Sequence, residues 1–182
     1  HAWLQGVLPR TLRPRVVVHP GASAPSRRYP LDHFSEVLRL LADADQFDVV
    51  LVGGAADTAA LEYLSRLAPP TLTVLKPPDM GKLAALIESA AVLVANNSAP
   101  AHLAAATQTP VVDLYALTNP QHHPWRVPSR VLSADVPCRN CYRSVCPHAH
   151  HGCLRGVTPA AVAAAVHALL DSTPRQRASL GL

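Results

Sequence analysis

The chain has 182 residues, a formal net charge of +4, and 49% apolar residues of which few are aromatic. This length suits one domain with a sizeable core, and the apolar fraction excludes an intrinsically disordered chain. No apolar run reaches the roughly 18 residues that a membrane-spanning helix needs. The basic residues form neither a run nor a stripe interleaved with aromatic residues, so we expect no nucleic-acid partner.

Short apolar runs alternate with stretches of helical spacing along the chain. The expected strands are Val16–His19, Asp48–Val52, Leu72–Leu75, Val92–Ala95, Val111–Tyr115 and Val131–Ser133. The expected helices are Leu31–Asp43, Asp57–Leu67, Met80–Ser89, Ala99–Thr107 and Thr158–Leu170. Asp79, Ser98 and Thr158 stand where helix N-caps are expected.

This alternation predicts an α/β fold, a Rossmann-like doubly wound parallel sheet in a single domain over residues 1–182. We expect residues 1–14 to be a linker or incoming connection, residues 15–171 to form the domain with a Cys-rich loop at 137–154, and residues 172–182 to be a polar tail. Ligands of such sheets bind outside the carboxyl ends of the strands, which directs attention to the loops that follow them.

The loop after the first strand, residues 19–30, combines small residues, hydroxyl groups and positive charge. Gly21 and Ala22 let backbone N–H groups approach an anion, Ser23 adds a hydroxyl donor, and Arg27 and Arg28 add charge. The loop lacks the spacing of a P-loop and of the dinucleotide-binding glycine motif. It is interpreted as a phosphate cradle, with a Gly-Pro turn beside surface arginines as the alternative.

Three later loops carry further candidates. After the second strand, Asp57 could bind a ribose hydroxyl or simply cap the next helix. After the fourth, Asn97, Ser98 and Ala99 open a helix whose N-terminus favours an anion, and His102 lies one turn in. A core role is the alternative for His102. After the fifth, Thr118 is expected to line the same crevice.

Several of these segments resemble the ADP-heptose:lipopolysaccharide heptosyltransferase family, whose members have the GT-B fold. The resemblance spans roughly Val16 to Leu170, and the Cys-rich end also looks like that family's tail. The segments that carry it are Pro20-Gly21-Ala22-Ser23, Arg27-Arg28-Tyr29-Pro30, the run from Asn96 to Ala106, and Thr109-Pro110-Val111-Val112.

The resemblance implies that this chain is the C-terminal half of an inverting glycosyltransferase, the half that binds a nucleotide-diphosphate sugar of the ADP-heptose type. The acceptor glycolipid and the catalytic base would belong to an N-terminal half, so we expect no catalytic residue here and no transfer by this chain alone. It also implies lipopolysaccharide or related glycan synthesis in the cytoplasm, where the full-length protein could bind peripherally at the inner membrane. No cofactor is required.

On matching positions, the resemblance places Ser23 and Arg27 at the diphosphate, with Arg27 where the family usually has Lys. It places Asn97, Ser98, Ala99 and His102 at the pyrophosphate and sugar, and Asp57 near the ribose. Three residues depart from the family pattern: Asn97 replaces Asp, Ala99 replaces Gly, and Ala101 replaces Met. A non-catalytic nucleotide-sugar-binding module and a sugar-nucleotide epimerase of GT-B fold therefore stay open as alternatives, and a zinc-dependent nucleic-acid module is a more distant one.

All the cysteines of the chain lie in one short stretch: Cys138, Cys141, Cys146 and Cys153. The first two have the Cys-x-x-Cys spacing of a metal site, whereas the later spacings are less regular. Such crowding is not a disulfide framework spread over a fold, so a reducing compartment is expected. Structural zinc, free thiols that pack the loop, and an oxidised disulfide remain the three interpretations.

Overall fold

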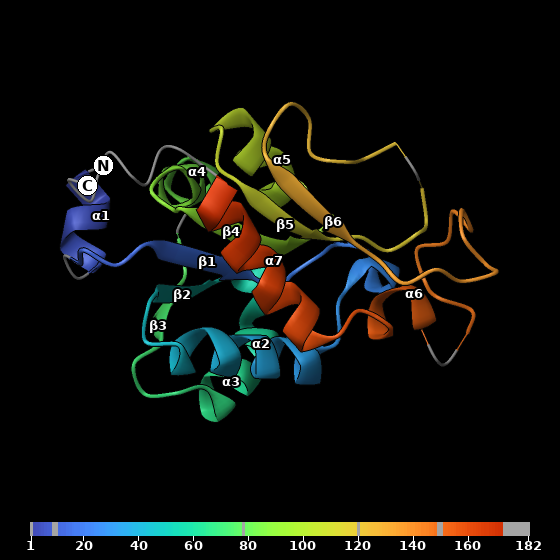
Figure 1. Ribbon diagram of the computed structural model, residues 1–182, viewed down its shortest axis with the longest axis horizontal. Coiled ribbons are helices and arrows are strands. Elements are labelled where there is room, and N and C mark those ends of the chain that lie inside the picture. Colours follow the sequence, from blue (N-terminus) through green and yellow to red (C-terminus); the bar gives the residue numbers. More distant parts are fainter. Residues whose placement is uncertain (1, 9–10, 78, 120, 149–150, 173–182) are drawn as a thin grey trace.

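A computed structural model describes residues 2–8, 11–77, 79–119, 121–148 and 151–172. Over these ranges the chain forms one parallel sheet between two layers of helices (Figure 1). The strand order is β3-β2-β1-β4-β5-β6, and every neighbouring pair is parallel. The strands are β1 (Arg15–His19), β2 (Asp48–Val52), β3 (Thr73–Leu75), β4 (Val92–Asn96), β5 (Val111–Leu114) and β6 (Ser129–Leu132). The predicted doubly wound sheet is confirmed.

The helices follow the strands in the alternation that the sequence predicts. They are α1 (Ala2–Val7), α2 (Leu31–Asp43), α3 (Thr58–Leu67), α4 (Met80–Glu88), α5 (Ala99–Ala106), α6 (Gly152–Arg155) and α7 (Pro159–Ser172), with 3-10 turns η1 (Pro25–Arg27) and η2 (Ala55–Asp57). Of the expected caps, Asp79 accepts a hydrogen bond from the Lys82 N–H at 2.8 Å and Thr158 accepts one from the Ala161 N–H at 3.2 Å.

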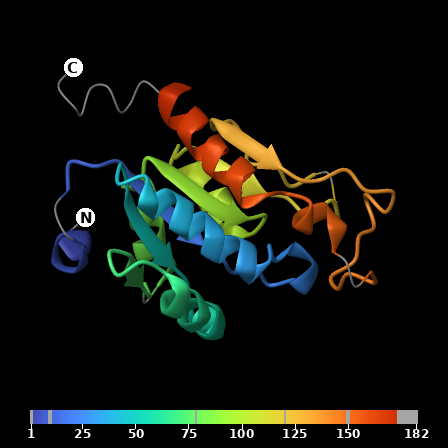
Figure 2. The same cartoon turned by 60° about the horizontal axis from the view of Figure 1, so that its bottom comes forward.

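Each face of the sheet buries its own apolar cluster. On one face, α2, α3 and α7 cover side chains such as Val16, Val18 and Leu51. On the other, α1, α4 and α5 cover Val17 and Leu93. Figure 2 shows α2 and α7 side by side across the first of these faces. Alternate residues of one strand therefore enter different clusters, and the central strands are apolar on both sides, as a sheet with two covered faces requires.

Residues 1–14, expected to be a linker or incoming connection, include the helix α1, which was not predicted. The helix is only six residues long, so it shows little periodicity, but Leu4 and Leu8 both become buried. They lie four residues apart and so share one helix face. They join the cluster that contains Leu86 and Ile87 of α4. Burial of this pair against the domain, and not the helical propensity of so short a segment, stabilises α1.

The observed boundaries of some elements differ by one or two residues from those predicted from the sequence. The last strand, expected at Val131–Ser133, is Ser129–Leu132, because residues 129–132 pair in register with β5. The helix expected over Asp57–Leu67 begins as the turn η2 and continues as α3 from Thr58. Helix α6, within the Cys-rich loop, was not predicted. The expected tail beyond Ser172 lies outside the described residues.

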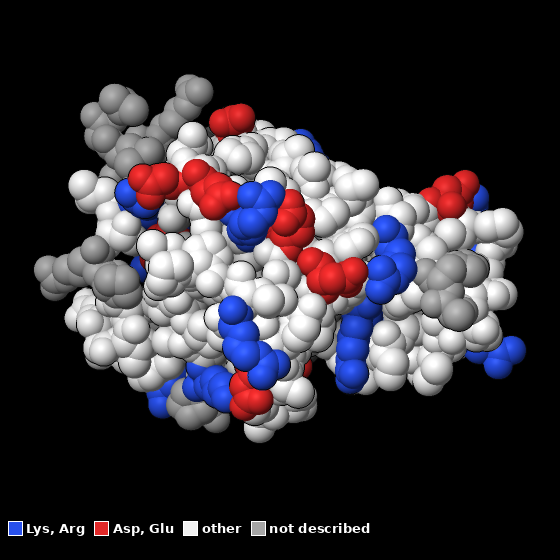
Figure 3. Space-filling view, turned by 90° about the horizontal axis from the view of Figure 1, so that it is seen from below, with Lys and Arg blue, Asp and Glu red and all other residues white. Residues whose placement is uncertain are grey.

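Charged side chains intermingle over the face that α2 and α3 cover (Figure 3). On α2, Arg39 pairs with Glu36 at 2.5 Å and with Asp43 at 2.6 Å, all on the exposed side of the helix. This face therefore carries paired charges of both signs. None of the helices in the described part of the chain is long and apolar enough to cross a bilayer.

Candidate functional site

The candidate site lies where the order of the strands reverses. Strands β1 and β4 are neighbours in the sheet, and from them the chain continues outward in opposite directions, to β2 and to β5. His19 at the end of β1 lies in register with Ala95 of β4. The loops that leave these two strands therefore diverge at one edge of the sheet, which is where ligands of doubly wound sheets bind.

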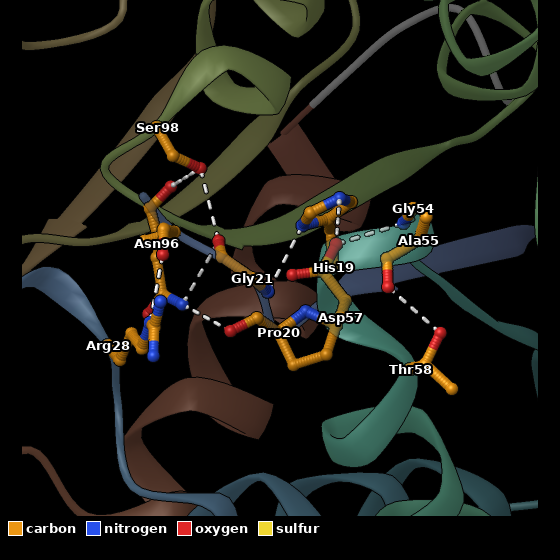
Figure 4. A network of polar contacts seen from close by, with 11 residues as sticks. His19, Pro20, Gly21, Arg28, Gly54, Ala55, Asp57, Thr58, Asn96 and Ser98 are labelled. Atoms are coloured by element: carbon orange, nitrogen blue, oxygen red, sulfur yellow. Dashed lines mark hydrogen bonds and ion pairs between the residues drawn. The ribbon is translucent and has the colours of Figure 1, made fainter. Parts of the chain in front are cut away.

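Asn96, the last residue of β4, ties these two loops together (Figure 4). Its side-chain Nδ2 donates to the Pro20 carbonyl at 2.6 Å and lies 3.4 Å from the Gly21 carbonyl. Its Oδ1 accepts the Tyr29 N–H at 2.8 Å. Asn96 is fully buried. One carboxamide thus satisfies backbone groups at both ends of the loop that follows β1, and buried backbone groups need such partners.

A second polar group lies on the β2 side of the same loop. The Asp57 carboxylate accepts the Gly54 N–H at 2.9 Å and faces Nε2 of His19 at 3.8 Å. Nδ1 of His19 accepts the Gly21 N–H at 3.2 Å, and burial lowers the pKa of this imidazole although Asp57 opposes the shift. Asp57 thus braces a turn before α3 and makes no side-chain hydrogen bond to the N–H groups of α3 itself.

Gly21 has no room for a side chain at this junction. A Cβ atom built there would lie 2.1 Å from Oδ1 of Asp57, far inside contact distance. A side chain at position 21 would therefore displace the Asp57 carboxylate from its contacts with the Gly54 N–H and His19. The predicted contact between Asp57 and a ribose hydroxyl stays a prediction.

The predicted diphosphate residues lie on the rim of the site. Ser23 is exposed and Arg27, in the turn η1, is partly exposed. The positive charge of Arg27 reaches the Tyr115 phenol beyond β5, where it opposes the rise in pKa that burial causes. Arg28 is turned back, and its Nε donates to the Ala22 carbonyl at 2.8 Å. Of these two arginines, Arg27 is thus the one whose charge acts near the carboxyl end of β5.

Helix α5 begins beside these groups. Ser98 occupies the N-cap position as predicted, but its hydroxyl makes no hydrogen bond to the helix. That hydroxyl instead contacts the carbonyls of Asn96 at 3.1 Å and Gly21 at 3.3 Å. The expected side-chain cap is therefore wrong, and the first turn of α5 is left to another acceptor. Ala99 starts the helix without a positive φ, so an alanine fits where the family pattern has glycine.

The structure does not gather all the predicted residues at one point. His102 is exposed and, with Trp125 and Arg126, lines a separate open basin on the outer side of α5. Thr118 is buried and lines a cavity together with Ser26 and the four cysteines. Ser23, Arg27, Asp57, Ser98 and Ala99 remain around the reversal of strand order.

Asn97 points into the protein. Its Nδ2 donates to the His122 carbonyl at 2.6 Å and to Oδ2 of Asp113, on β5, at 3.3 Å. Asp113 is fully buried, and its other oxygen, Oδ1, has no hydrogen-bond partner. Burial raises the pKa of Asp113 to about 7, although the hydrogen bond from Asn97 opposes this shift. An amide at position 97 therefore matches a buried carboxyl group at position 113.

The comparisons with known proteins agree with this architecture. The family model described as glycosyltransferase family 9 (heptosyltransferase) matches residues 5–151. The chain belongs to this family. Lipopolysaccharide heptosyltransferase 2 of Escherichia coli K12 is 28% identical over 165 residues, which are 87% of this chain and 47% of the relative. Lipopolysaccharide heptosyltransferase 3 of the same strain is 33% identical over 115 residues, 61% of this chain and 33% of the relative.

Solved structures of the family share the fold. The E. coli ADP-heptose lipopolysaccharide heptosyltransferase II superimposes with a TM-score of 0.75 at 25% identity, covering 92% of this chain and 49% of that one. The family 9 glycosyltransferase of Veillonella parvula gives a TM-score of 0.81 at 20% identity, with 94% and 50% covered. The chain thus spans about half the length of the relatives it matches, and its Rossmann-like class is the one expected of a GT-B glycosyltransferase.

Two residues of the candidate site were missed in the sequence analysis. Asn96 was treated only as the start of a polar turn, and Asp113 only as part of an apolar strand. A charged residue inside the run Val111–Leu114 is a signal that could have been used, because a carboxylate within a buried strand needs a specific partner.

Asp113→Asn should stabilise the protein in a pH-dependent way. The unfolded chain loses the Asp113 proton near the ordinary pKa of 3.8, whereas the folded protein holds it to about pH 7. The folded state thus binds more protons between these values, so the stability of the native-sequence chain falls as pH rises through that window, by about 4 kcal/mol in all. The variant loses this dependence. Urea unfolding should therefore show a gain of about 4 kcal/mol at pH 8 but only about 1 kcal/mol at pH 4.5, where most of the penalty has not yet developed.

A matched control for this experiment is Asp45→Asn. Asp45 lies on the surface in an exposed ion pair with Arg13. Its replacement should change stability by no more than about 0.5 kcal/mol at either pH. Equal gains for Asp113→Asn at both pH values would contradict the assignment of Asp113 as a buried, protonated carboxyl group.

Asn97→Asp should destabilise the protein, even though it restores the usual residue of the family. The change removes the donor that Asp113 and the His122 carbonyl accept from, and it brings two carboxyl groups together. The double variant Asn97→Asp/Asp113→Asn should recover at least about 1 kcal/mol relative to the single variant at pH 8. Asn140→Asp, on the exposed loop, serves as the control. Additive effects in this double-mutant cycle would show that positions 97 and 113 are independent.

Proposed function

We propose that this chain is the nucleotide-sugar-binding half of a glycosyltransferase that transfers a sugar from an ADP-heptose-type donor in lipopolysaccharide or related glycan synthesis. The observation that carries the proposal is that two elements that favour the binding of an anion lie next to each other where the strand order reverses. These are the loop after β1, with Ser23 and Arg27 on its rim, and the first turn of α5, which no side chain of the described residues caps.

The donor diphosphate would lie between these elements. Backbone N–H groups at a helix N-terminus favour phosphate oxygens, and a guanidinium fork binds them in pairs. Arg27 is partly exposed, and none of its contacts within the described residues is an ion pair, so its charge is available. Ser98 links the start of α5 to the loop after β1 through its contacts to the carbonyls of Gly21 and Asn96.

In this proposal the chain contributes to catalysis by stabilising the negative charge that develops on the donor. As the bond between sugar and phosphate breaks, negative charge grows on the leaving nucleoside diphosphate, and the positive charge of Arg27 with the α5 N-terminus stabilises it. The acceptor hydroxyl attacks from the opposite side, with inversion, and a base takes its proton. Neither carboxylate near the site suits that task, because Asp113 is fully buried and Asp57 is engaged by Gly54 and His19. The base would therefore come from another part of the protein, as would the glycolipid site, and the chain alone would transfer nothing.

Asn97 no longer favours the alternative of a non-catalytic binding module. The interpretation as a non-catalytic module supposes that an essential Asp at position 97 has been lost. Here the amide is matched to Asp113 by a hydrogen bond, so its presence follows from local packing. The epimerase alternative requires carboxylates that can reach the sugar, and the engagement of Asp57 and burial of Asp113 count against it.

Nucleotide binding tests the proposal. Calorimetric titration of the purified chain should detect ADP, and a panel with GDP and UDP should rank ADP first. Arg27→Ala should weaken ADP binding about tenfold, because it removes a charge-assisted contact to phosphate. Arg66→Ala, an exposed arginine at the end of α3, should leave the affinity unchanged. Failure to bind any of the three nucleotides, or equal losses in the two variants, would refute the proposal.

Sugar transfer tests the division of labour. The isolated chain should show no transfer to a lipopolysaccharide-core acceptor, whereas the longer protein should. Transfer by the isolated chain would show that the base lies within it, contrary to the proposal.

A further inference from the structure

The four cysteines converge on one cavity although they are spread over sixteen positions of the sequence. Cys138, Cys141, Cys146 and Cys153 all line it, with Thr118 at the same wall. The cavity has a volume of about 20 Å³. That is room for one small particle, since a single water needs about 10–15 Å³ measured in this way. A nucleotide or a sugar does not fit.

The chemistry of the lining suits a metal ion better than a water molecule. A buried water needs two to four good hydrogen-bonding partners, and thiols are weak donors and weak acceptors. Four cysteines are, by contrast, the ligand set of many structural zinc and iron sites. Cys138 and Cys141 also have the spacing that such sites commonly use.

The loop that carries the cysteines has little regular structure of its own. Between β6 and α6 it runs for nearly twenty residues, and loops longer than about 12–15 residues are uncommon unless something organises them. Its contacts with the domain are short and specific. Ser26 donates its N–H to the Ser144 carbonyl at 3.0 Å and its hydroxyl to the Arg143 carbonyl at 2.6 Å, and the Tyr142 N–H donates to the Thr118 carbonyl at 2.8 Å.

We propose that these four cysteines bind one structural thiophilic metal ion, zinc or iron, which fastens the loop of residues 134–153 onto the domain beside the turn η1. The ion would be held by all four thiolates, and binding would release the four thiol protons to solvent. No other reactant is needed, and the metal would not take part in catalysis.

In the structure the four cysteines do not yet form a complete metal site. Over the described ranges, which omit residues 149–150 of this loop, no three His, Cys, Asp or Glu side chains already stand at the separations of a metal site. The Cys146 thiol instead donates to the His148 carbonyl at 3.2 Å. Metal binding would therefore have to draw the four sulfurs closer together, and rotation about χ1 is the usual way for a side chain to move its end without moving the backbone. His151 is set apart from the ligands because its Nε2 lies 2.7 Å from the Ser26 carbonyl.

Metal analysis tests the inference directly. The chain purified without added metal should contain roughly one zinc or iron ion per molecule by plasma mass spectrometry. Cys138→Ser and Cys153→Ser should each reduce that content at least about tenfold. Pro147→Ala, which lines the same cavity but offers no ligand atom, should keep the ion. A metal-free native-sequence chain, or equal metal content in all variants, would overturn the proposal.

Two measurements on the native sequence keep the test independent of whether the serine variants fold. Thiol titration should find the four cysteines protected until a strong chelator is added and reactive afterwards. Cobalt(II) added to the chelator-treated chain should give a sulfur-to-cobalt charge-transfer absorption. Four thiols that react freely before chelation, disulfides in their place, or no such absorption would each contradict the site. None of these readouts depends on nucleotide binding.

Discussion

The carboxamide of Asn96 is the contact on which the candidate site depends. It stands at the point where the sheet reverses its strand order, and it reaches across from β4 to the loop that leaves β1. By accepting the Tyr29 N–H it also holds the far end of that loop. Tyr29 is itself anchored, because its hydroxyl donates to the Val157 carbonyl at 2.8 Å and its ring packs edge-on against Phe34. Both ends of the loop that carries Ser23 and Arg27 are therefore held in place by buried contacts.

Most of the sheet could be predicted because its strands are buried on both faces. In a strand such as β4, which is buried at every position, residues 92–95 are all apolar, and that run is visible in the sequence. The amphipathic helix α2 is visible for a similar reason. Helix α1 could not be predicted, because two leucines one turn apart carry no pattern until α4 supplies the surface that covers them. Helix α6 lies in a Cys-rich segment where composition hides any period.

The site was predictable as a set of loops but not as a set of contacts. The rule that ligands lie beyond the carboxyl ends of parallel strands needs only the order of elements. Which polar side chain serves the protein and which faces a ligand depends on tertiary neighbours. Asn97 meets Asp113 only because β4 and β5 are adjacent, and His102 turns outward only because α5 lies on the sheet with its small residues inward. Sequence spacing contains neither fact.

The close approach of Gly21 and Asp57 has a consequence for how this protein can vary. The Asp57 carboxylate occupies the space where any side chain at position 21 would begin. Neither position can be treated as an independent site of substitution. A larger residue at 21 would have to push the carboxylate aside or be joined by a smaller residue at 57, and either change would remove the acceptor of the Gly54 N–H. In a library of folded variants, substitutions at positions 21 and 57 should therefore occur together more often than independently, although the two residues belong to different loops.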